Sequence, residues 1–244
     1  MLERSIEVFR PHHLELRKRV IRIFISIIIF TAIAYFFSER IAEILVAPLY
    51  TATPLMKKMV YTNLPEAFIA YIKLSLLIGI AASFPVILYQ TWSFVAPGLK
   101  EGEKKIAVTV VFWGSFLFGL GAFFAAFGVL PRMLNYFMSY ASPQLEPLPK
   151  LGKYLTFVIR TIIAFGLAFQ IPFLMVMTGK ADIVSSMYFR RKRWYFYIGI
   201  TILAFLLTAG DLMATVLLAI PLMMLYEIGI LLMRLFQRKA RKKA

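Results

Sequence analysis

Three carboxylates lie in otherwise basic segments that adjoin apolar runs: Glu15 in HHLELRKRV, and Glu101 and Glu103 in LKEGEKK. A carboxylate can accept two hydrogen bonds from the planar guanidinium of an arginine, which a lysine ammonium cannot match. If the three acids converge, they form an acidic patch that selects arginine. A local interpretation is equally open, because Glu15 follows His12 by three residues and precedes Arg19 by four, the spacing of an ion pair within one helix.

Other chemistry has little support in the residues. His12 and His13 are adjacent, so they do not share one face of a helix, and no third ligand lies nearby. The chain has no cysteine, no phosphate-binding G-x-x-x-x-G-K-[ST] motif, no H-E-x-x-H and no G-x-S-x-G. The sequence therefore predicts a protein that is not an enzyme and that has no catalytic residue, metal site or cofactor.

Four polar residues interrupt the apolar runs, where ionisable groups are costly and are functional candidates. Lys73 and Arg160 lie near the ends of their runs and can extend to lipid headgroups. Glu227 is expected to pair with a nearby base. Gln170 stands two residues before Pro172, so its amide either bonds the carbonyl that the proline leaves unpaired or faces a polar cavity.

The composition is typical of an integral membrane protein. Of 244 residues, 61% are hydrophobic, and the mean hydropathy is +0.78. The net charge of +16 does not favour nucleic-acid binding, because the basic residues flank apolar runs, where they set topology and contact anionic lipids. The first apolar run is expected to be a retained span rather than a cleaved signal peptide.

The apolar segments predict six transmembrane helices in a single membrane domain, residues 1–244. Their approximate bounds are 20–37, 68–95, 106–130, 154–178, 195–208 and 212–233. The tails and loops on one side carry nineteen Lys and Arg residues, and the loops on the other side carry six. This bias places both termini in the cytoplasm.

The fifth and sixth spans are predicted to form a short hairpin, because only residues 209–211 separate them. The fifth span has roughly 14 residues, about 21 Å of helix, against about 30 Å of hydrocarbon. Pro85 and Pro221 predict bends in the second and sixth spans. Between the first two spans, apolar residues at helical spacing predict a short amphipathic helix that ends at Pro48.

Several segments together resemble one family. They are HLELRKR before the first span, VAPL around Pro48, SFPVILYQTWSFVAPGLKEGEKK at 83–105, FGLAFQIP around Gln170, LTAGD at 207–211 and LLAIPLMMLYEIG in the last span. In these the chain resembles the TatC family, the receptor core of twin-arginine protein translocation, over nearly its whole length.

The resemblance implies a cupped, all-α, six-span protein of the inner membrane that binds the twin-arginine signal peptides of folded proteins at its cytoplasmic face. It implies small single-span partner subunits, contact with membrane lipids and a homo-oligomer within the complex, with no nucleic acid. The acids that match arginine-recognising positions are Glu15 and Glu103, and Arg17 and Phe94 match other functionally important positions. With Glu101 of the acidic patch, these are the predicted signal-peptide-binding residues. Those that match structural or partner-docking positions are Pro48, Gln170 and Asp211.

One departure concerns Gln170, where relatives often have an acid, so a charged role does not carry over, although an amide can still bond a partner helix. The alternative function is an ion-coupled secondary transporter of a small solute, based on Gln170, Glu227 and the proline-interrupted spans. A third hypothesis, a lipid-organising structural protein, is based on the short hairpin and the basic tails.

Overall fold

The computed structural model describes residues 2–52, 59–60, 63, 65–95, 104–140, 148–180, 184–208 and 210–241. The chain divides into two compact units, which we describe separately. Unit 1 is Met1–Glu43 with Asn63–Phe116, and unit 2 is Ile44–Thr62 with Leu117–Ala244. Nearly all described residues are helical, which confirms the predicted all-α class.

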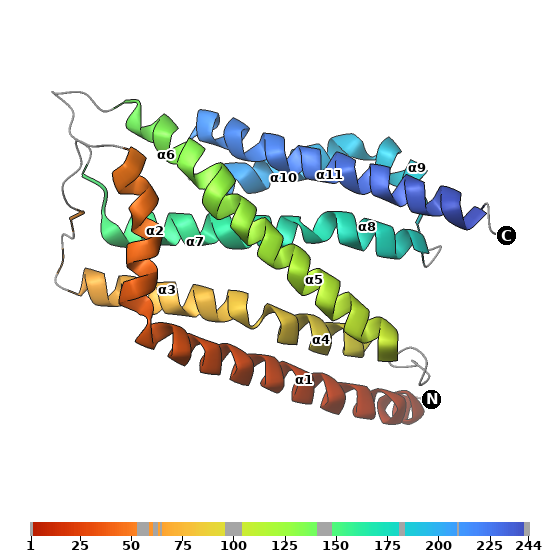
Figure 1. The fold of residues 1–244 in the computed structure, drawn as a ribbon. Coiled ribbons are helices and arrows are strands. Elements are labelled where there is room, and N and C mark those ends of the chain that lie inside the picture. The colour runs from red at the N-terminus through yellow and green to blue at the C-terminus, as the bar shows by residue number, and fades with distance from the viewer. Residues whose placement is uncertain are drawn as a thin grey trace. The chain divides into compact units, whose positions relative to one another are not determined.

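The helices follow one another along the chain. In chain order they are α1 (Leu2–Phe36), α2 (Ser38–Ala52), α3 (Glu66–Ala82), α4 (Phe84–Val95), α5 (Lys104–Phe124), the π-helical turn η2 (Ala125–Val129), α6 (Leu130–Met138), α7 (Leu151–Ala168), α8 (Gln170–Lys180), α9 (Ser186–Arg191), α10 (Arg193–Leu207) and α11 (Leu212–Arg241) (Figure 1). Among the described residues there is one isolated parallel β-bridge, Val60–Lys150.

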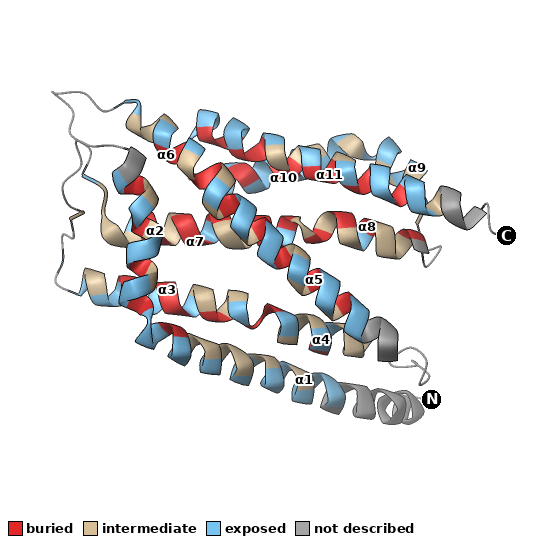
Figure 2. Ribbon diagram, viewed as in Figure 1, coloured by how far each residue is buried: buried red, intermediate tan, exposed pale blue. Residues whose placement is uncertain are grey.

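In unit 1, α1 lies alongside α3 and α4 (Figure 1). The backbones of α1 and α3 approach closely at Gly79, where an added Cβ would lie 2.7 Å from the backbone nitrogen of Thr31. Many apolar side chains of α1 are exposed, such as Ile28 and Phe36, and much of this helix is accessible in Figure 2. An exposed apolar face of this extent is typical of a helix that contacts lipid.

The break between α3 and α4 bends the chain by 48°. It lies at Ser83, whose hydroxyl donates a hydrogen bond to the carbonyl of Gly79 (2.7 Å). Pro85 follows two residues later and has no backbone N–H to continue the helical pattern. The bend predicted from Pro85 is therefore confirmed.

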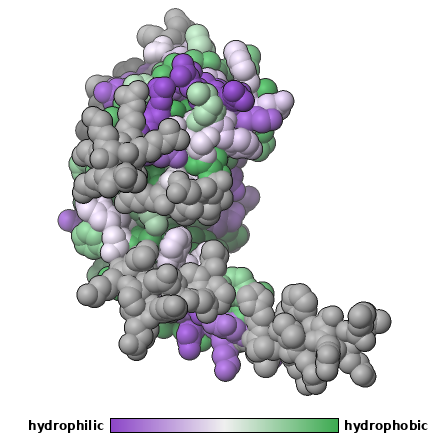
Figure 3. Space-filling view, turned by 90° about the vertical axis from the view of Figure 1, so that its right-hand side faces the viewer, coloured by the Kyte–Doolittle hydropathy of each residue, from purple (hydrophilic) through white to green (hydrophobic). Residues whose placement is uncertain are grey.

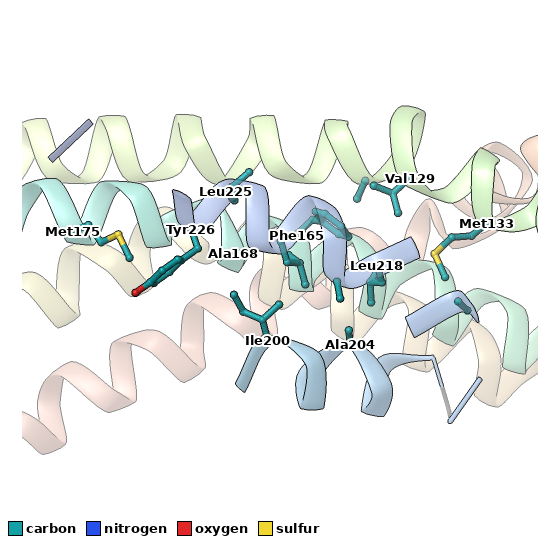
Figure 4. Packing of buried hydrophobic residues seen from close by; sticks show 14 of the residues in the cluster. Val129, Met133, Phe165, Ala168, Met175, Ile200, Ala204, Leu218, Leu225 and Tyr226 are labelled. Atoms are coloured by element: carbon teal, nitrogen blue, oxygen red, sulfur yellow. The ribbon is translucent and has the colours of Figure 1, made fainter. Parts of the chain in front are cut away.

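Unit 2 contains a buried apolar core made by α7, α8, α10, α11 and the η2 region (Figure 4). Phe165, Ala204, Leu218 and Tyr226 have no exposed surface. The small Ala204 on α10 lies in this core with the larger side chains of α7 and α11, so these helices pack closely there.

By length and apolar composition, four segments of the described residues could cross a membrane: Glu15–Phe36, Val108–Met138, Leu151–Gly179 and Leu212–Gln237. The bent pair α3 and α4 makes a fifth if it forms one span. The apolar helix α10 has 15 residues, about 22 Å, and it is as short as the sequence predicts.

The sixth helix is not short, and that prediction is wrong. α11 has 30 residues, from Leu212 to Arg241. The helix continues beyond the apolar run into the basic segment after Met233 because arginine, lysine, glutamine and leucine are good helix formers.

Pro48 does not end α2, contrary to expectation, since the helix continues to Ala52. Leu49 is fully buried, and the hydroxyl of Tyr154 on α7 donates a hydrogen bond to the carbonyl of Leu45 (2.8 Å). These tertiary contacts in unit 2 oppose the helix-breaking effect of the proline.

Candidate functional site

The first candidate residue, Glu15, has an exposed side chain on α1 of unit 1. Its Oε1 accepts hydrogen bonds from Nε (3.2 Å) and Nη2 of Arg19, one turn along the helix. Nη1 of Arg19 lies 3.5 Å from the backbone carbonyl oxygen of Gln90 on α4. The predicted local ion pair is thus present, and through Arg19 it also joins α1 to α4.

The geometry of this pair shows what the carboxylate can bind. Two nitrogens of one guanidinium converge on the single oxygen Oε1 of Glu15, a pair of coplanar donors that the point-like ammonium of a lysine does not present. The side chain of Glu15 remains 46% exposed, whereas that of Arg19 is only 16% exposed. A ligand from solvent can therefore reach the carboxylate more readily than it can reach the arginine.

Two further predicted site residues lie in unit 1. Arg17 is exposed on α1, and Phe94 is half-buried near the end of α4, the helix that α1 contacts. Glu101 and Glu103 lie outside the described residues. Their convergence with Glu15 therefore stays a prediction.

Two polar groups on α4 were not singled out in the sequence. Gln90 is 7% exposed, and within the part of the chain that the structure describes its Oε1 has no hydrogen-bond partner; the same holds for the indole nitrogen of Trp92. Most buried polar groups are bonded, so these two favour a polar partner at this end of unit 1. The sequence signal for these two groups is that Gln90 and Trp92 carry polar atoms within a mostly apolar helix.

Pro48, a predicted structural or docking residue, lies within α2 in unit 2. The hydrogen bond between Tyr154 and the carbonyl of Leu45 joins the proline-containing turn to α7. Tyr154 is itself buried. The partner of this turn is thus part of the same chain.

Gln170 is buried in unit 2, with 8% of its surface exposed. Its Nε2 donates to the carbonyl of Gly166 (3.4 Å), whereas the carbonyl that loses its donor to Pro172 belongs to Ala168. The bond to Gly166 thus reaches a carbonyl two residues before the one that the proline leaves without a donor.

Asp211 begins α11. Its Oδ1 accepts a hydrogen bond from the backbone N–H of Ala214 (2.6 Å), the geometry of a helix N-cap. The preceding Gly210 has a φ of 91°, a left-handed conformation that glycine adopts without steric cost. Thr208 and Thr215 join their hydroxyls across the same turn (2.8 Å).

The polar residues within the spans divide into paired and exposed groups. Glu227 accepts hydrogen bonds from Nη2 of Arg193 and from the hydroxyl of Tyr197, both at 2.6 Å, so the predicted pairing is confirmed. Lys73 and Arg160 are exposed, which is consistent with side chains that extend toward headgroups.

These features define a class: a multi-pass, α-helical membrane protein whose charged residues lie mostly at helix ends. Comparison with known proteins gives the family. The family described as Sec-independent protein translocase protein (TatC) matches residues 11–221.

Relatives match almost end to end. A protein of Desulforapulum autotrophicum named Sec-independent protein translocase protein TatC is 38% identical over 95% of this chain and 86% of the relative. The TatC of Aquifex aeolicus is 36% identical over 95% and 96%. A solved structure titled "Crystal Structure of Twin Arginine Translocase Receptor- TatC" superposes with a TM-score of 0.84 at 34% identity, covering 92% of this chain and 99% of that one.

The chain belongs to the TatC family. It is a multi-pass membrane protein with the family role in Sec-independent protein translocation. The resemblance found in its motifs is confirmed.

Proposed function

We propose that this chain is a non-enzymatic receptor and scaffold subunit that binds twin-arginine signal peptides, with Glu15 and Glu103 as the carboxylates that take the arginine pair. The observation that carries the proposal is the bond between Glu15 and a guanidinium. Arg19 occupies the carboxylate with the same two donors that an arginine of a peptide would present.

The electrostatic setting supports selectivity. Glu15 lies among Arg17, Lys18 and Arg19. These residues repel any cation, so a cation must offset the repulsion with strong hydrogen bonds, as a guanidinium can. An incoming arginine exchanges one charge-assisted bond of Glu15 for another, and the displaced Arg19 keeps the carbonyl of Gln90 as an acceptor. Arg17, Phe94 and Glu101 complete the proposed site.

The finer architecture is part of the same proposal. We place six spans in a single, cupped membrane domain of the inner membrane, with α10 as the fifth span and both termini cytoplasmic. The excess of basic residues on one side supports this orientation. Single-span partner subunits, membrane lipids and further copies of this chain are the proposed assembly partners, and Pro48, Gln170 and Asp211 are proposed structural or docking positions.

The test is binding of a fluorescent signal peptide to the purified protein in detergent. A peptide with an arginine pair should bind more tightly than the same peptide with a lysine pair. The double variant Glu15→Ala with Glu103→Ala should lose this binding, because no carboxylate remains to accept the guanidinium fork.

The matched control is the double variant Glu39→Ala with Glu43→Ala, which removes two exposed carboxylates of α2. It should bind the arginine peptide as the unmodified protein does. Equal affinity for the two peptides, or unchanged binding by the Glu15 and Glu103 variant, would contradict the assignment of these carboxylates to the binding site.

The transporter alternative gains no support from the described residues. Its candidate Glu227 already accepts bonds from Arg193 and Tyr197. Its other candidate, Gln170, is buried and donates to the carbonyl of Gly166.

A further inference from the structure

The turn between α9 and α10 presents three adjacent cations, Arg190, Arg191 and Lys192, which we call the basic turn. All three side chains are exposed. No Asp or Glu occurs between residues 184 and 208. The positive charge of this turn is therefore not balanced by an acid of its own segment.

The basic turn is held in place by contacts within unit 2. The hydroxyl of Tyr226 on α11 donates a hydrogen bond to the carbonyl of Phe189 (2.8 Å). The ring of Tyr226 also stacks on Phe196 of α10, with 4.9 Å between the centroids. Nearer the start of α9, the backbone N–H of Ser186 donates to Gln237 (3.3 Å). The cations thus project from a fixed support rather than from a loose tail.

The next cation, Arg193, has a different role. It bonds Glu227 on α11 (2.6 Å), the acid contributed to this region from another element. That carboxylate also accepts the hydroxyl of Tyr197. Glu227 is thus already engaged by Arg193 and Tyr197, and the basic turn retains its charge.

Two aromatic side chains stand beside the basic turn at the start of apolar α10. Trp194 is 76% exposed and Tyr195 is 70% exposed, and Nζ of Lys192 lies 4.9 Å from the centre of the Tyr195 ring. Exposed tryptophan and tyrosine at the end of an apolar helix are typical of the membrane–water interface. Figure 3 views the end of unit 2 that carries α9 and shows hydrophilic surface gathered toward its top.

We propose that the basic turn is a binding site for the headgroup phosphate of an anionic phospholipid. The cations supply charge-assisted hydrogen bonds to the phosphate, and Trp194 and Tyr195 place the site at headgroup depth. Charge complementarity, a fixed support and interfacial aromatics occur together here. A soluble anion would use the charge alone and would not need the aromatic pair.

The chain carries its own reporter for this site. It has three tryptophans, so a Trp92→Phe, Trp113→Phe variant leaves Trp194 as the sole fluorophore. In vesicles that contain a small fraction of brominated lipid, brominated phosphatidylglycerol should quench Trp194 more strongly than brominated phosphatidylcholine. Adding Arg190→Gln, Arg191→Gln and Lys192→Gln should reduce this preference by about tenfold or more, given the attraction of each basic residue to an anionic surface.

Control variants separate the site from general charge. Substituting Lys73, Lys150 and Lys153 with glutamine removes the same charge elsewhere and should leave the quenching preference intact. If this control loses the preference equally, or if the two brominated lipids quench equally, the proposal fails. If millimolar inorganic phosphate abolishes the preference at constant ionic strength, the site binds free phosphate and the lipid assignment fails.

A second measurement leaves Trp92 and Trp113 unchanged. Native mass spectrometry of the otherwise unmodified chain should show retained phosphatidylglycerol, and the triple glutamine variant of the basic turn should retain less of it. Equal retention by both proteins would overturn the proposal. Because signal-peptide binding involves unit 1, the peptide assay can succeed or fail without changing either result.

Discussion

Asp211 shows how one side chain can matter to this fold without contacting a ligand. Its carboxylate accepts the N–H of Ala214 in the first turn of α11, and the negative charge lies at the positive end of the helix dipole. We propose a structural or docking position for this residue, and the described contacts give it a local structural role.

Replacing this cap separates the two roles. Asp211→Ala should lower the free energy of unfolding by about 1 kcal/mol, because the Ala214 amide loses its acceptor. Asp211→Asn keeps an acceptor oxygen and should stay close to the unmodified protein. Thermal unfolding in detergent measures both variants. If asparagine destabilises as much as alanine, the charge rather than the cap is the important feature.

At the scale of residues, the sequence predicts contacts within one helix better than contacts between residues that are far apart in the sequence. The bond between Glu15 and Arg19 follows from a spacing of four. The contact of Arg19 with the carbonyl of Gln90 joins positions 71 residues apart, and Tyr154 meets Leu45 across 109 residues. Those contacts depend on tertiary packing, which no local pattern specifies.

Among the elements, α1 and α3 cross with very little free space at Gly79. An added Cβ at Gly79 would lie 2.7 Å from the backbone nitrogen of Thr31 and 2.8 Å from its Cα. Backbone atoms cannot rotate away as a side chain does, so the two helices themselves would have to separate. Small residues allow this kind of close approach between helices in membranes.

The Gly79→Ala substitution should therefore destabilise unit 1 by about 1 to 3 kcal/mol through overpacking. Gly119→Ala in α5 is the matched control, because nothing lies within 4 Å of the added Cβ. There, alanine should raise stability by up to about 1 kcal/mol through its helix propensity. Thermal unfolding of both variants is the measurement, and a neutral Gly79→Ala would show that the helices separate at little cost.

The two helix ends that the sequence does not predict, those of α2 and α11, each have a physical explanation. Proline lowers the helix propensity of α2, yet burial of Leu49 and the bond from Tyr154 keep the helix continuous through Pro48. The hydropathy pattern predicts that the last span ends near Met233. Because helix formation does not depend on hydropathy, α11 continues beyond that residue to Arg241. Composition thus predicts the apolar part of an element better than its end.

For the whole molecule, the important quantity is the length of α10, the proposed fifth span, relative to the thickness of the bilayer. Its 15 residues reach about 22 Å, against about 30 Å of hydrocarbon. The mismatch is relieved when the bilayer around the helix is thin. The protein should thus have a higher melting temperature in vesicles of short-chain phosphatidylcholine than in vesicles of long-chain phosphatidylcholine.

Lengthening α10 tests whether its length causes the preference for a thin bilayer. Inserting three leucines after Ile202 adds about one turn and should move the most stabilising lipid toward longer chains. Circular dichroism during heating in each lipid gives the melting temperatures. If the unmodified and lengthened proteins respond identically to chain length, α10 does not set the preferred thickness.

The tight turn before Asp211 also affects how the chain inserts into the membrane during its synthesis. A 15-residue apolar helix is a weak signal for insertion while it emerges from the ribosome, since the hydrophobic free energy of insertion grows with length. Only residues 208–211 separate α10 from the strongly apolar α11, so α10 cannot remain far from it. The two helices should therefore insert together during translation. Until α11 has been synthesised, α10 should remain at the membrane surface.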